Sequence, residues 1–541
     1  MKKYSKTRVL VGGLALASLL FTGCGNSDNF VFTNTVPNVT PVLTPPQAVN
    51  DARSALGNAT VTYTAANGVL SNDTLNGGVI SEFDGTASSG GTVTLNADGS
   101  FSYTPAAQFV GSETFTYTLA NDDGESTATV TMTSTGSGWF VDNTAGTSGD
   151  GTQAAPFDTL DEAVATAQPG DTIYVRRGNG TTTGLSNPIT LPQGVSLIGE
   201  GEGLILAQTV EAQGQAPQLG GTVTLSGNNV VSGFTFVSTG SAAIVGDGVA
   251  DCTVSNNRFE EEASNLVQVY FASATGTTVV TDNTFIQDFD TDSVSILADA
   301  TGSFNITNNT FELAGLTANG DDCVTILVED GGNATFQISG NFFDGSGSTN
   351  PSMERGIHLN LRDNGSQASL TADGNRSTAL SARDVEIITE DATQLTSAIF
   401  TNNVFEDCEN LSVGLLASDS SELVAVLEAN TISGGQEAIV ADADDTSDLR
   451  LALRNNINLA GVLRAVRIQA GSAGSLCAEI VGNTFGGDLR FNESTSDSLD
   501  VEQFGDSMGS VLATLNTFTT GGIDVATGTV TSVTDNACSI P

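Results

Sequence analysis

The chain has 541 residues, of which 62 are acidic and 17 are basic, so its formal net charge is −45. A field of this sign repels nucleic acids, and we therefore exclude a nucleic-acid partner. The acidity itself has two interpretations, which are general solubility in salty surroundings and specific binding of calcium ions.

The first 23 residues differ from the rest in composition. They contain no acidic residue and an apolar run from 9 to 21, which is short for a membrane span, and they end directly before Cys24. Four basic residues precede or begin this run, Lys2, Lys3, Lys6 and Arg8. The pattern resembles a bacterial lipoprotein signal, which implies lipidation of Cys24 and anchoring of the exported protein at a membrane, at the cell surface. A plain secretory signal with an incidental cysteine is the alternative.

Residues 24–47 carry Asn, Thr, Ser and four prolines and have little to bury, so we expect a disordered tether. Once residues 1–23 are removed, 13 arginines face 62 carboxylates, a formal charge of −49, and no lysine remains.

From residue 48 to 135 the chain alternates short strands with turns. Residues 91–105 form two alternating runs around Asp98-Gly99, which predicts a β-hairpin. This segment, with Asn50-Asp51 and residues 69–73, resembles the cadherin-like or immunoglobulin-like repeats of bacterial surface proteins. The resemblance implies a β-sandwich with calcium ligands at strand ends, namely Asp51, Asp73, Asp122 and Asp123. The alternative is that these aspartates only form turns.

A different pattern begins at Trp139. A glycine-rich turn at 146–155 is followed by Thr159-Leu160-Asp161-Glu162, a capping box that opens a short amphipathic helix, and by a strand at 173–175. Such a helix suits the open apolar end of a stack of coils. The order of elements is similar to the N-terminal start of many secreted β-helix proteins.

From about residue 231 onward the chain repeats one six-residue pattern. It consists of an apolar residue, a small polar residue, Gly, Asn or Asp, then Asn, any residue and Phe, as in 254–259 and 280–285. The second Asn recurs at steps of 20 to 34 residues, at 257, 283, 309, 341, 375, 403, 430, 456, 483, 516 and 536. Repeats of this length indicate a solenoid, and short alternating runs without a helical period indicate coils of strands. Stacked coils place Phe on Phe and Asn on Asn.

This repeat resembles the right-handed parallel β-helix of the pectate-lyase-like superfamily. The fold prediction is therefore all-β, with a right-handed parallel β-helix over 139–541 preceded by a small β-sandwich over 48–135. The superfamily includes lyases, hydrolases, epimerases and adhesins, so the resemblance does not name an activity. Cys477 and Cys538 are placed to join the last coils, and Cys252, Cys323 and Cys408 are expected as small apolar residues in the stack.

Aligning the coils predicts one column of outward-pointing side chains. On the strand after the variable loop, a period of two sends outward Gln268, Ser295, Thr325, His358, Glu386 and Arg467. Charged residues directly precede these strands, namely Asp292, Asp321, Asp322, Arg355 and Arg383. We therefore expect a groove that contains carboxylates, arginines and the only histidine of the chain. The alternative is that solenoid surfaces are polar and some residues align by chance.

The residues Asp321-Asp322-Cys323 resemble the Asp-Asp-Cys stretch of polygalacturonases, and Thr291-Asp292 resembles their Asn-Thr-Asp. On this resemblance Asp322 protonates the leaving oxygen, Asp292 and Asp321 hold the attacking water, and His358 and an arginine bind the sugar. A polysaccharide lyase would instead use Arg355 or Arg383 as the base. Calcium would then lie on Asp288, Asp290 and Asp292 and neutralise a uronate.

The sequence as a whole favours an exported surface lipoprotein whose β-helix is a non-catalytic binding or display module, for carbohydrate or for a neighbouring surface. The rival is a polysaccharide-degrading enzyme, either a hydrolase or a lyase. Calcium is the one cofactor that the sequence implies. Asp292, Asp322 and His358 gathered in a walled cleft would favour the enzyme, whereas a flat arrangement would favour binding.

Overall fold

A computed structural model describes residues 44–540 except 207, 238–241, 261–266, 288–291, 314–321, 347–352, 494–497, 504–508, 528–529 and 535–536. The predicted signal peptide, Cys24 and nearly all of the tether lie outside the described residues, as do Asp288, Asp290 and Asp321. None of the helices in the described part is long and apolar enough to cross a membrane.

The first folded part is a β-sandwich. One sheet contains β1 (Asp51–Gly57), β3 (Val79–Phe83), β6 (Gly111–Asn121) and β7 (Gly124–Val141), and the other contains β2 (Val61–Tyr63), β4 (Thr92–Leu95) and β5 (Phe101–Thr104). A 3-10 turn, η1 (Ala65–Asn67), follows β2. The rings of Tyr63, Phe101 and Phe115 pack in the interior because alternate residues of these strands point inward. The predicted hairpin is confirmed, since β4 and β5 pair in antiparallel register.

The chain enters the solenoid along β7, whose last residues pair in parallel with β8 (Thr172–Val175). The predicted cap helix is confirmed as α1 (Leu160–Thr166), which begins directly after Thr159 and buries Leu160 and Ala163. A hairpin of β11 (Leu204–Ile205) and β12 (Thr209–Glu211) leaves the coil that follows β10.

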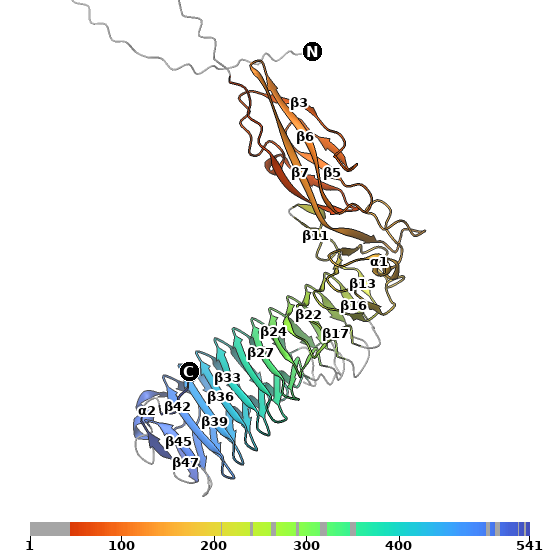
Figure 1. Ribbon diagram of the computed structural model, residues 1–541. Helices are drawn as coiled ribbons and strands as arrows, with labels where there is room; N and C mark the ends of the chain where they lie inside the picture. Colours follow the sequence, from red (N-terminus) through yellow and green to blue (C-terminus); the bar gives the residue numbers. More distant parts are fainter. Residues whose placement is uncertain are drawn as a thin grey trace, which may run out of the picture. The chain divides into compact units, whose positions relative to one another are not determined.

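The solenoid is built of coils that each contribute strands to three parallel sheets, and successive coils stack regularly (Figure 1). Sheet 1 follows the β7 end and comprises β8, β10 (Ser196–Gly199), β15 (Val230–Ser232), β18 (Thr253–Ser255), β21 (Gly276–Thr281), β24 (Thr301–Thr307), β27 (Asn333–Ser339), β30 (Gln367–Asp373), β33 (Gln394–Thr401), β36 (Glu422–Glu428), β39 (Asp448–Arg454), β42 (Ser475–Val481), β45 (Ser498–Glu502) and β48 (Thr531–Val533). Sheet 2 comprises β13 (Gln218–Leu219), β16 (Thr235–Val237), β19 (Arg258–Glu260), β22 (Thr284–Gln287), β25 (Thr310–Leu313), β28 (Phe342–Asp344), β31 (Arg376–Thr378), β34 (Val404–Cys408), β37 (Thr431–Gly434), β40 (Ile457–Ala460), β43 (Thr484–Phe485) and β46 (Thr517–Phe518).

Sheet 3 carries the candidate site. It comprises β9 (Ile189–Thr190), β14 (Val223–Thr224), β17 (Ile244–Asp247), β20 (Val269–Ala272), β23 (Val294–Ala298), β26 (Val324–Val328), β29 (Arg355–Leu361), β32 (Arg383–Thr389), β35 (Leu411–Ala417), β38 (Glu437–Ala443), β41 (Arg464–Ala470), β44 (Leu489–Glu493) and β47 (Ile523–Thr527). A short helix, α2 (Ser510–Leu515), lies near the C-terminal end of the chain.

Two side-chain columns hold the coils in register, as the repeat predicted. The buried asparagines hydrogen-bond from coil to coil between Asn257 and Asn516, so that each Nδ2 donates to the next Oδ1 at 2.9–3.2 Å. Beside them the rings of Phe236, Phe259, Phe285, Phe311 and Phe343 stack with centroids 4.8–5.0 Å apart. The amides satisfy backbone groups of the bends that would otherwise be buried without partners.

Cysteines occupy the predicted places. Cys477 and Cys538 form a disulfide across a sequence separation of 61 residues, which ties the C-terminal segment to sheet 1. Cys252, Cys323 and Cys408 are free and buried.

Candidate functional site

The candidate site lies where β26, β29 and β32 of sheet 3 run side by side. Thr325, His358 and Glu386 are direct neighbours in the register of these strands. Arg355 and Arg383 are paired at the strand starts, and Asp322 lies two residues ahead of β26. Alternation along each strand buries the apolar neighbours, such as Ile357 and Val385, and turns this polar column outward.

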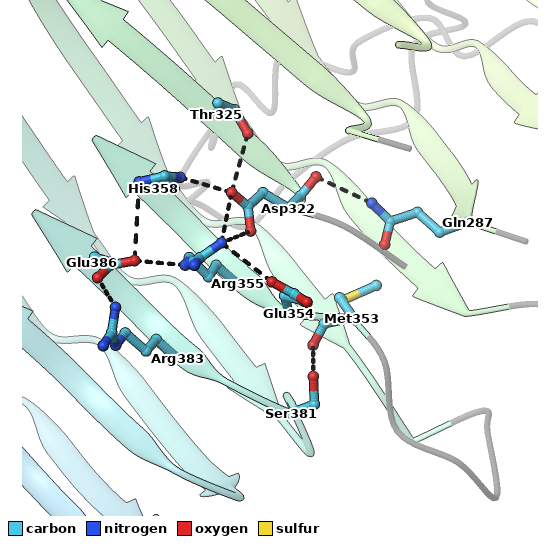
Figure 2. Close-up of polar contacts among 10 residues, drawn as sticks. All are labelled: Gln287, Asp322, Thr325, Met353, Glu354, Arg355, His358, Ser381, Arg383 and Glu386. Atoms are coloured by element: carbon cyan, nitrogen blue, oxygen red, sulfur yellow. Dashed lines mark hydrogen bonds and ion pairs between the residues drawn. The ribbon is translucent and has the colours of Figure 1, made fainter. Parts of the chain in front are cut away.

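Asp322 is the centre of the first half of the cluster (Figure 2). Its Oδ1 accepts a hydrogen bond from Arg355 Nη1 at 3.0 Å, and its Oδ2 lies 2.8 Å from His358 Nδ1. The hydroxyl of Thr325 lies 3.4 Å from the same Oδ2. The Asp322 side chain is only 5% exposed, so its neighbours rather than water solvate the carboxylate.

Glu386 is the centre of the second half. Its Oε2 lies 2.6 Å from Arg355 Nε, and its Oε1 forms an ion pair with Arg383. His358 Nε2 lies 3.9 Å from Oε2 of Glu386. Arg355 and His358 therefore both lie between the two carboxylates, as Figure 2 shows.

The two kinds of charge lie at different depths. Asp322 and Glu386 are 5% and 3% exposed, whereas Arg355, His358 and Arg383 are 23%, 20% and 27% exposed. The carboxylates thus lie beneath and hold the side chains above them in fixed orientations. His358 Nδ1 faces Asp322 and its Nε2 is buried, so what the site presents to solvent is the guanidinium N–H donors of Arg355 and Arg383.

A third carboxyl group lies inside the solenoid next to the cluster. Asp384 follows Arg383 on β32 and is 1% exposed, and Ser377 Oγ of sheet 2 donates a hydrogen bond to its Oδ1 at 2.6 Å. Burial raises the pKa of Asp384 to about 7, an effect that Ser377 and Ser412 partly offset. Burial, together with the charge of Arg355, also lowers the pKa of Arg383.

The structure brings together three of the predicted catalytic residues, Asp322, Arg355 and His358. Asp292 lies two residues ahead of β23 as Asp322 lies two ahead of β26, and its backbone oxygen accepts a hydrogen bond from the amide of Gln268. Asp321, Asp288 and Asp290 lie outside the described residues. The roles that the resemblance assigned to all of these residues stay predictions.

One outward position was predicted wrongly. Gln268 is fully buried, and its Nε2 donates to the backbone oxygen of Ile286 at 2.9 Å. Val269, not Val267, pairs with Val294, so Tyr270 takes the place in the column that was assigned to Gln268. The error arises because Gln268 lies in the bend ahead of β20, where the period of two no longer applies.

Sequence reasoning also missed Asp384. A signal was present, because the stacking position of that coil holds Ser377 in place of Phe. A hydroxyl at an aromatic position indicates a polar partner in the core.

The four aspartates predicted as calcium ligands of the sandwich lie in two separate locations. Asp51 pairs with Arg53 at 2.9 Å, and Asp73 accepts hydrogen bonds from Val49 N at 2.7 Å and Tyr117 Oη at 2.8 Å. Burial raises the pKa of Asp51 to about 6, and the nearby Asp73 contributes. Asp122 and Asp123 lie in the exposed turn between β6 and β7. No group of three or more His, Cys, Asp or Glu side chains in the described ranges is arranged to hold a metal ion, and calcium binding stays a prediction.

Comparison with known proteins divides the chain in the same way as the fold. Residues 44–136 match the bacterial cadherin-like domain, and residues 144–372 match a family described as a protein of unknown function, DUF1565. No curated protein matches the sequence.

Several solved structures are similar at low identity. A mutant of the periplasmic alginate epimerase AlgG is 11% identical over 69% of this chain and 83% of that chain, with a TM-score of 0.37. The family 28 exopolygalacturonase of Yersinia enterocolitica is 14% identical over 80% of this chain and 86% of that chain, with a TM-score of 0.34. Together, the match over residues 44–136 and the strand pairing described above show a bacterial cadherin-like domain followed by a parallel β-helix, whose residues 144–372 match the DUF1565 family.

Proposed function

We propose that the outer face of sheet 3 around Arg355, His358 and Arg383 binds a carbohydrate chain and does not cleave it. The observation that carries this proposal is the difference in depth within the cluster. Asp322 and Glu386 are nearly inaccessible, and the guanidinium groups of Arg355 and Arg383 above them are hydrogen-bond donors. Sugar hydroxyl and carboxyl oxygens accept hydrogen bonds from such donors.

The fold supports an extended ligand. Neighbouring strands of sheet 3 lie about 4.8 Å apart, so equivalent side chains on successive coils form a straight row. Because ion pairs to Asp322 and Glu386 fix the guanidinium of Arg355, it loses little side-chain entropy when a ligand binds. A rigid row of donors suits a linear polymer better than a small compact ligand.

Cleavage is the second candidate, and one contact favours it. His358 Nδ1 lies 2.8 Å from Asp322 Oδ2, an arrangement that orients an imidazole for proton transfer. Glycoside hydrolysis, however, requires two carboxyl groups that reach the scissile bond or its attacking water. Asp322 and Glu386 are both covered and paired with arginines, which argues for binding.

The experiment screens the purified protein against neutral and acidic polysaccharides, with and without calcium. Binding is measured by calorimetry, while reducing ends and unsaturated products report hydrolysis and lyase activity. We expect binding without product. Arg383→Gln and Arg355→Lys should each weaken binding about tenfold, the effect of losing one charge-assisted hydrogen bond.

The matched control is Arg376→Gln. Arg376 lies on sheet 2, is 59% exposed and pairs only weakly with Glu406 at 3.5 Å, so its loss should leave binding unchanged. Accumulation of either product would replace the binding proposal with the enzymatic one. Absence of binding to every polysaccharide would overturn both.

We also propose that the protein is exported and anchored through a lipid on Cys24. The basic and apolar segment ahead of Cys24 supports this proposal. Radiolabelled palmitate should be incorporated by the wild-type protein and not by Cys24→Ser, which should be released into the medium. Labelling of Cys24→Ser equal to that of the wild type would contradict the anchor.

A further inference from the structure

A pocket of about 390 Å³ opens on sheet 3 next to the candidate site. It is lined by Arg383, Asn410, Leu411, Gln436, Glu437, Val440, Leu463, Arg464 and Arg467. The outward column explains why it is hollow. Between Glu386 and Arg467 the column holds Gly414, which has no side chain, and then Val440, whose side chain is much shorter than that of Glu386 or Arg467. The pocket therefore begins at Arg383 and extends away from His358.

The charge of this pocket is opposite to that of the protein. Its lining contains three arginines and one glutamate in a chain whose net charge is −45, while the carboxylates of Glu386 and Asp442, which pair with Arg383 and Arg467, lie outside the lining. Arg464, Arg467 and Arg383 are 29%, 24% and 27% exposed, so they retain access to a ligand. A concave surface of one charge sign concentrates ligands of the opposite sign.

Glu437 holds two of these arginines in place. Its Oε1 lies 2.7 Å from Arg464 Nη1, and its Oε2 lies 3.1 Å from Arg467 Nε. A guanidinium has five N–H donors, and this carboxylate engages one nitrogen of each. Arg467 Nη1 is also engaged, by Gln469 Oε1 at 3.1 Å and by Asp442 Oδ2 at 3.8 Å. The N–H groups that remain on the two guanidinium groups are the donors available to a ligand.

Apolar surface borders the same pocket. Leu463 is 61% exposed, the adjacent Val462 is 84% exposed, and Leu411 contributes to the lining, whereas Val440 in the pocket floor is only 2% exposed. Exposed aliphatic side chains gain free energy by covering the C–H surface of a ligand. The pocket thus combines cationic donors with an apolar edge, which fits a sugar ring that carries a negatively charged substituent.

We infer that this pocket is the specificity subsite of the carbohydrate-binding face and takes a sugar residue bearing an oxyanion, which Arg464 and Arg467 bind. This inference rests on the proposed function and adds the class of ligand. A uronic-acid carboxylate, through its two oxygens, and a sulfate ester, through two of its three terminal oxygens, can each bind a guanidinium in a bidentate way. The experiment therefore tests glycans that carry uronic acids and glycans that carry sulfate esters separately.

The first experiment compares binding of the purified protein to three sets of glycans, one neutral, one rich in uronic acids and one sulfated. Arg464→Gln combined with Arg467→Gln should weaken binding of at least one acidic set by tenfold or more and leave neutral glycans unaffected. Glu437→Gln removes the competing carboxylate and should tighten acidic binding, a gain that a purely structural role does not produce. Arg450→Gln, at a comparably exposed arginine of sheet 1, is the control.

The second experiment does not depend on glycans. At constant ionic strength, sulfate should raise the Tm of the wild type above its value in chloride, and the double arginine variant should lose this difference. Equal glycan binding by the wild type and the double variant would overturn the inference while leaving the proposed function intact. A specific sulfate effect without any glycan binding would contradict the proposed function and the carbohydrate ligand, and leave only an anion site. No sulfate effect and no acidic preference would overturn the inference altogether.

Discussion

Ser377 donates a hydrogen bond of 2.6 Å to Asp384 across the interior of the β-helix. Ser377 occupies the position in sheet 2 that Phe343 and Phe405 occupy in the neighbouring coils. The aromatic column is therefore interrupted in the coil that also carries Arg383 and Glu386. A buried polar pair therefore replaces an aromatic contact beneath the proposed binding face.

Asp384→Asn should change how stability depends on pH. Burial raises the pKa of Asp384 to about 7, whereas an aspartate in the unfolded chain titrates near ~3.9. Because the folded pKa is the higher one, the contribution of Asp384 to stability is fully present below about pH 4 and is lost as the pH rises to about 7. At pH 8 the variant should be more stable than the wild type, by on the order of 4 kcal/mol at most.

The measurement is denaturant unfolding of both proteins at pH 4.5 and pH 8. The difference between variant and wild type should be small at the lower pH and large at the higher one. Ser377→Ala is the companion variant, since it removes the donor and should destabilise the protein by about 1–3 kcal/mol. Parallel pH profiles of Asp384→Asn and the wild type would contradict the assignment of this titration to Asp384.

Asn341→Ala should be strongly destabilising. The Asn341 amide donates to Ile306 O and Asn375 Oδ1 and accepts from the backbone and side-chain amides of Asn309. Its removal leaves buried groups of two adjacent coils without partners, which should cost about 3 kcal/mol or more. Chemical denaturation, monitored by circular dichroism, measures the change in the free energy of unfolding. Asn333→Ala, at an exposed position of β27, should shift the midpoint little, and equal effects of both variants would argue against the ladder.

Removal of the disulfide should destabilise the C-terminal end of the solenoid. Cys477 and Cys538 close a loop with a sequence separation of 61, and a cross-link of that span stabilises by about 4 kcal/mol in the chain-entropy account. The double variant Cys477→Ser, Cys538→Ser should expose the last coils to limited proteolysis while earlier coils stay protected. Reduction of the wild type should reproduce the effect. Identical digestion patterns of the oxidised and reduced proteins would refute it.

Arg355→Gln should lower the stability of the protein, and the loss should begin at the candidate site. Arg355 is the cation shared by Asp322 and Glu386, and removal of one partner from a buried ion pair costs about 3–5 kcal/mol. Arg355→Lys keeps the charge but cannot engage both carboxylates in the same way, so it should recover only part of the loss. In thermal unfolding the Tm should be highest for the wild type, lower for Arg355→Lys and lowest for Arg355→Gln. A Gln variant as stable as the wild type would mean that the network contributes nothing to folding.

Much of the fold was predictable because its signals are local and repeated. Each Asn and Phe of the motif recurs in the same place in the coil, so stacking follows from the repeat alone. The cap helix was predictable for a similar reason, since Thr159 to Glu162 mark its start within four residues. The alternation of strands likewise predicted that His358 and Glu386 point outward.

Which side chains of the site are buried and which are exposed was not predictable in the same way. Alternation assigns a face to Asp322, Arg355 and Glu386, but it does not say which of them covers the others. Nor does it apply in the bend ahead of β20, which is why Gln268 was misplaced. Asp384 was missed because its partner Ser377 comes from a different sheet.

The sequence by itself determined that this chain is a stack of strand coils, since periodic apolar, Asn and Phe positions have only one way to bury their side chains together. Only the tertiary structure decided that Asp322 and Glu386 lie below the arginines, and that Gly414 and Val440 leave a cationic pocket beside them. The physical reason is that ion pairing and hollow space depend on side chains from different coils, which lie about 30 residues apart in the chain and about 5 Å apart in space.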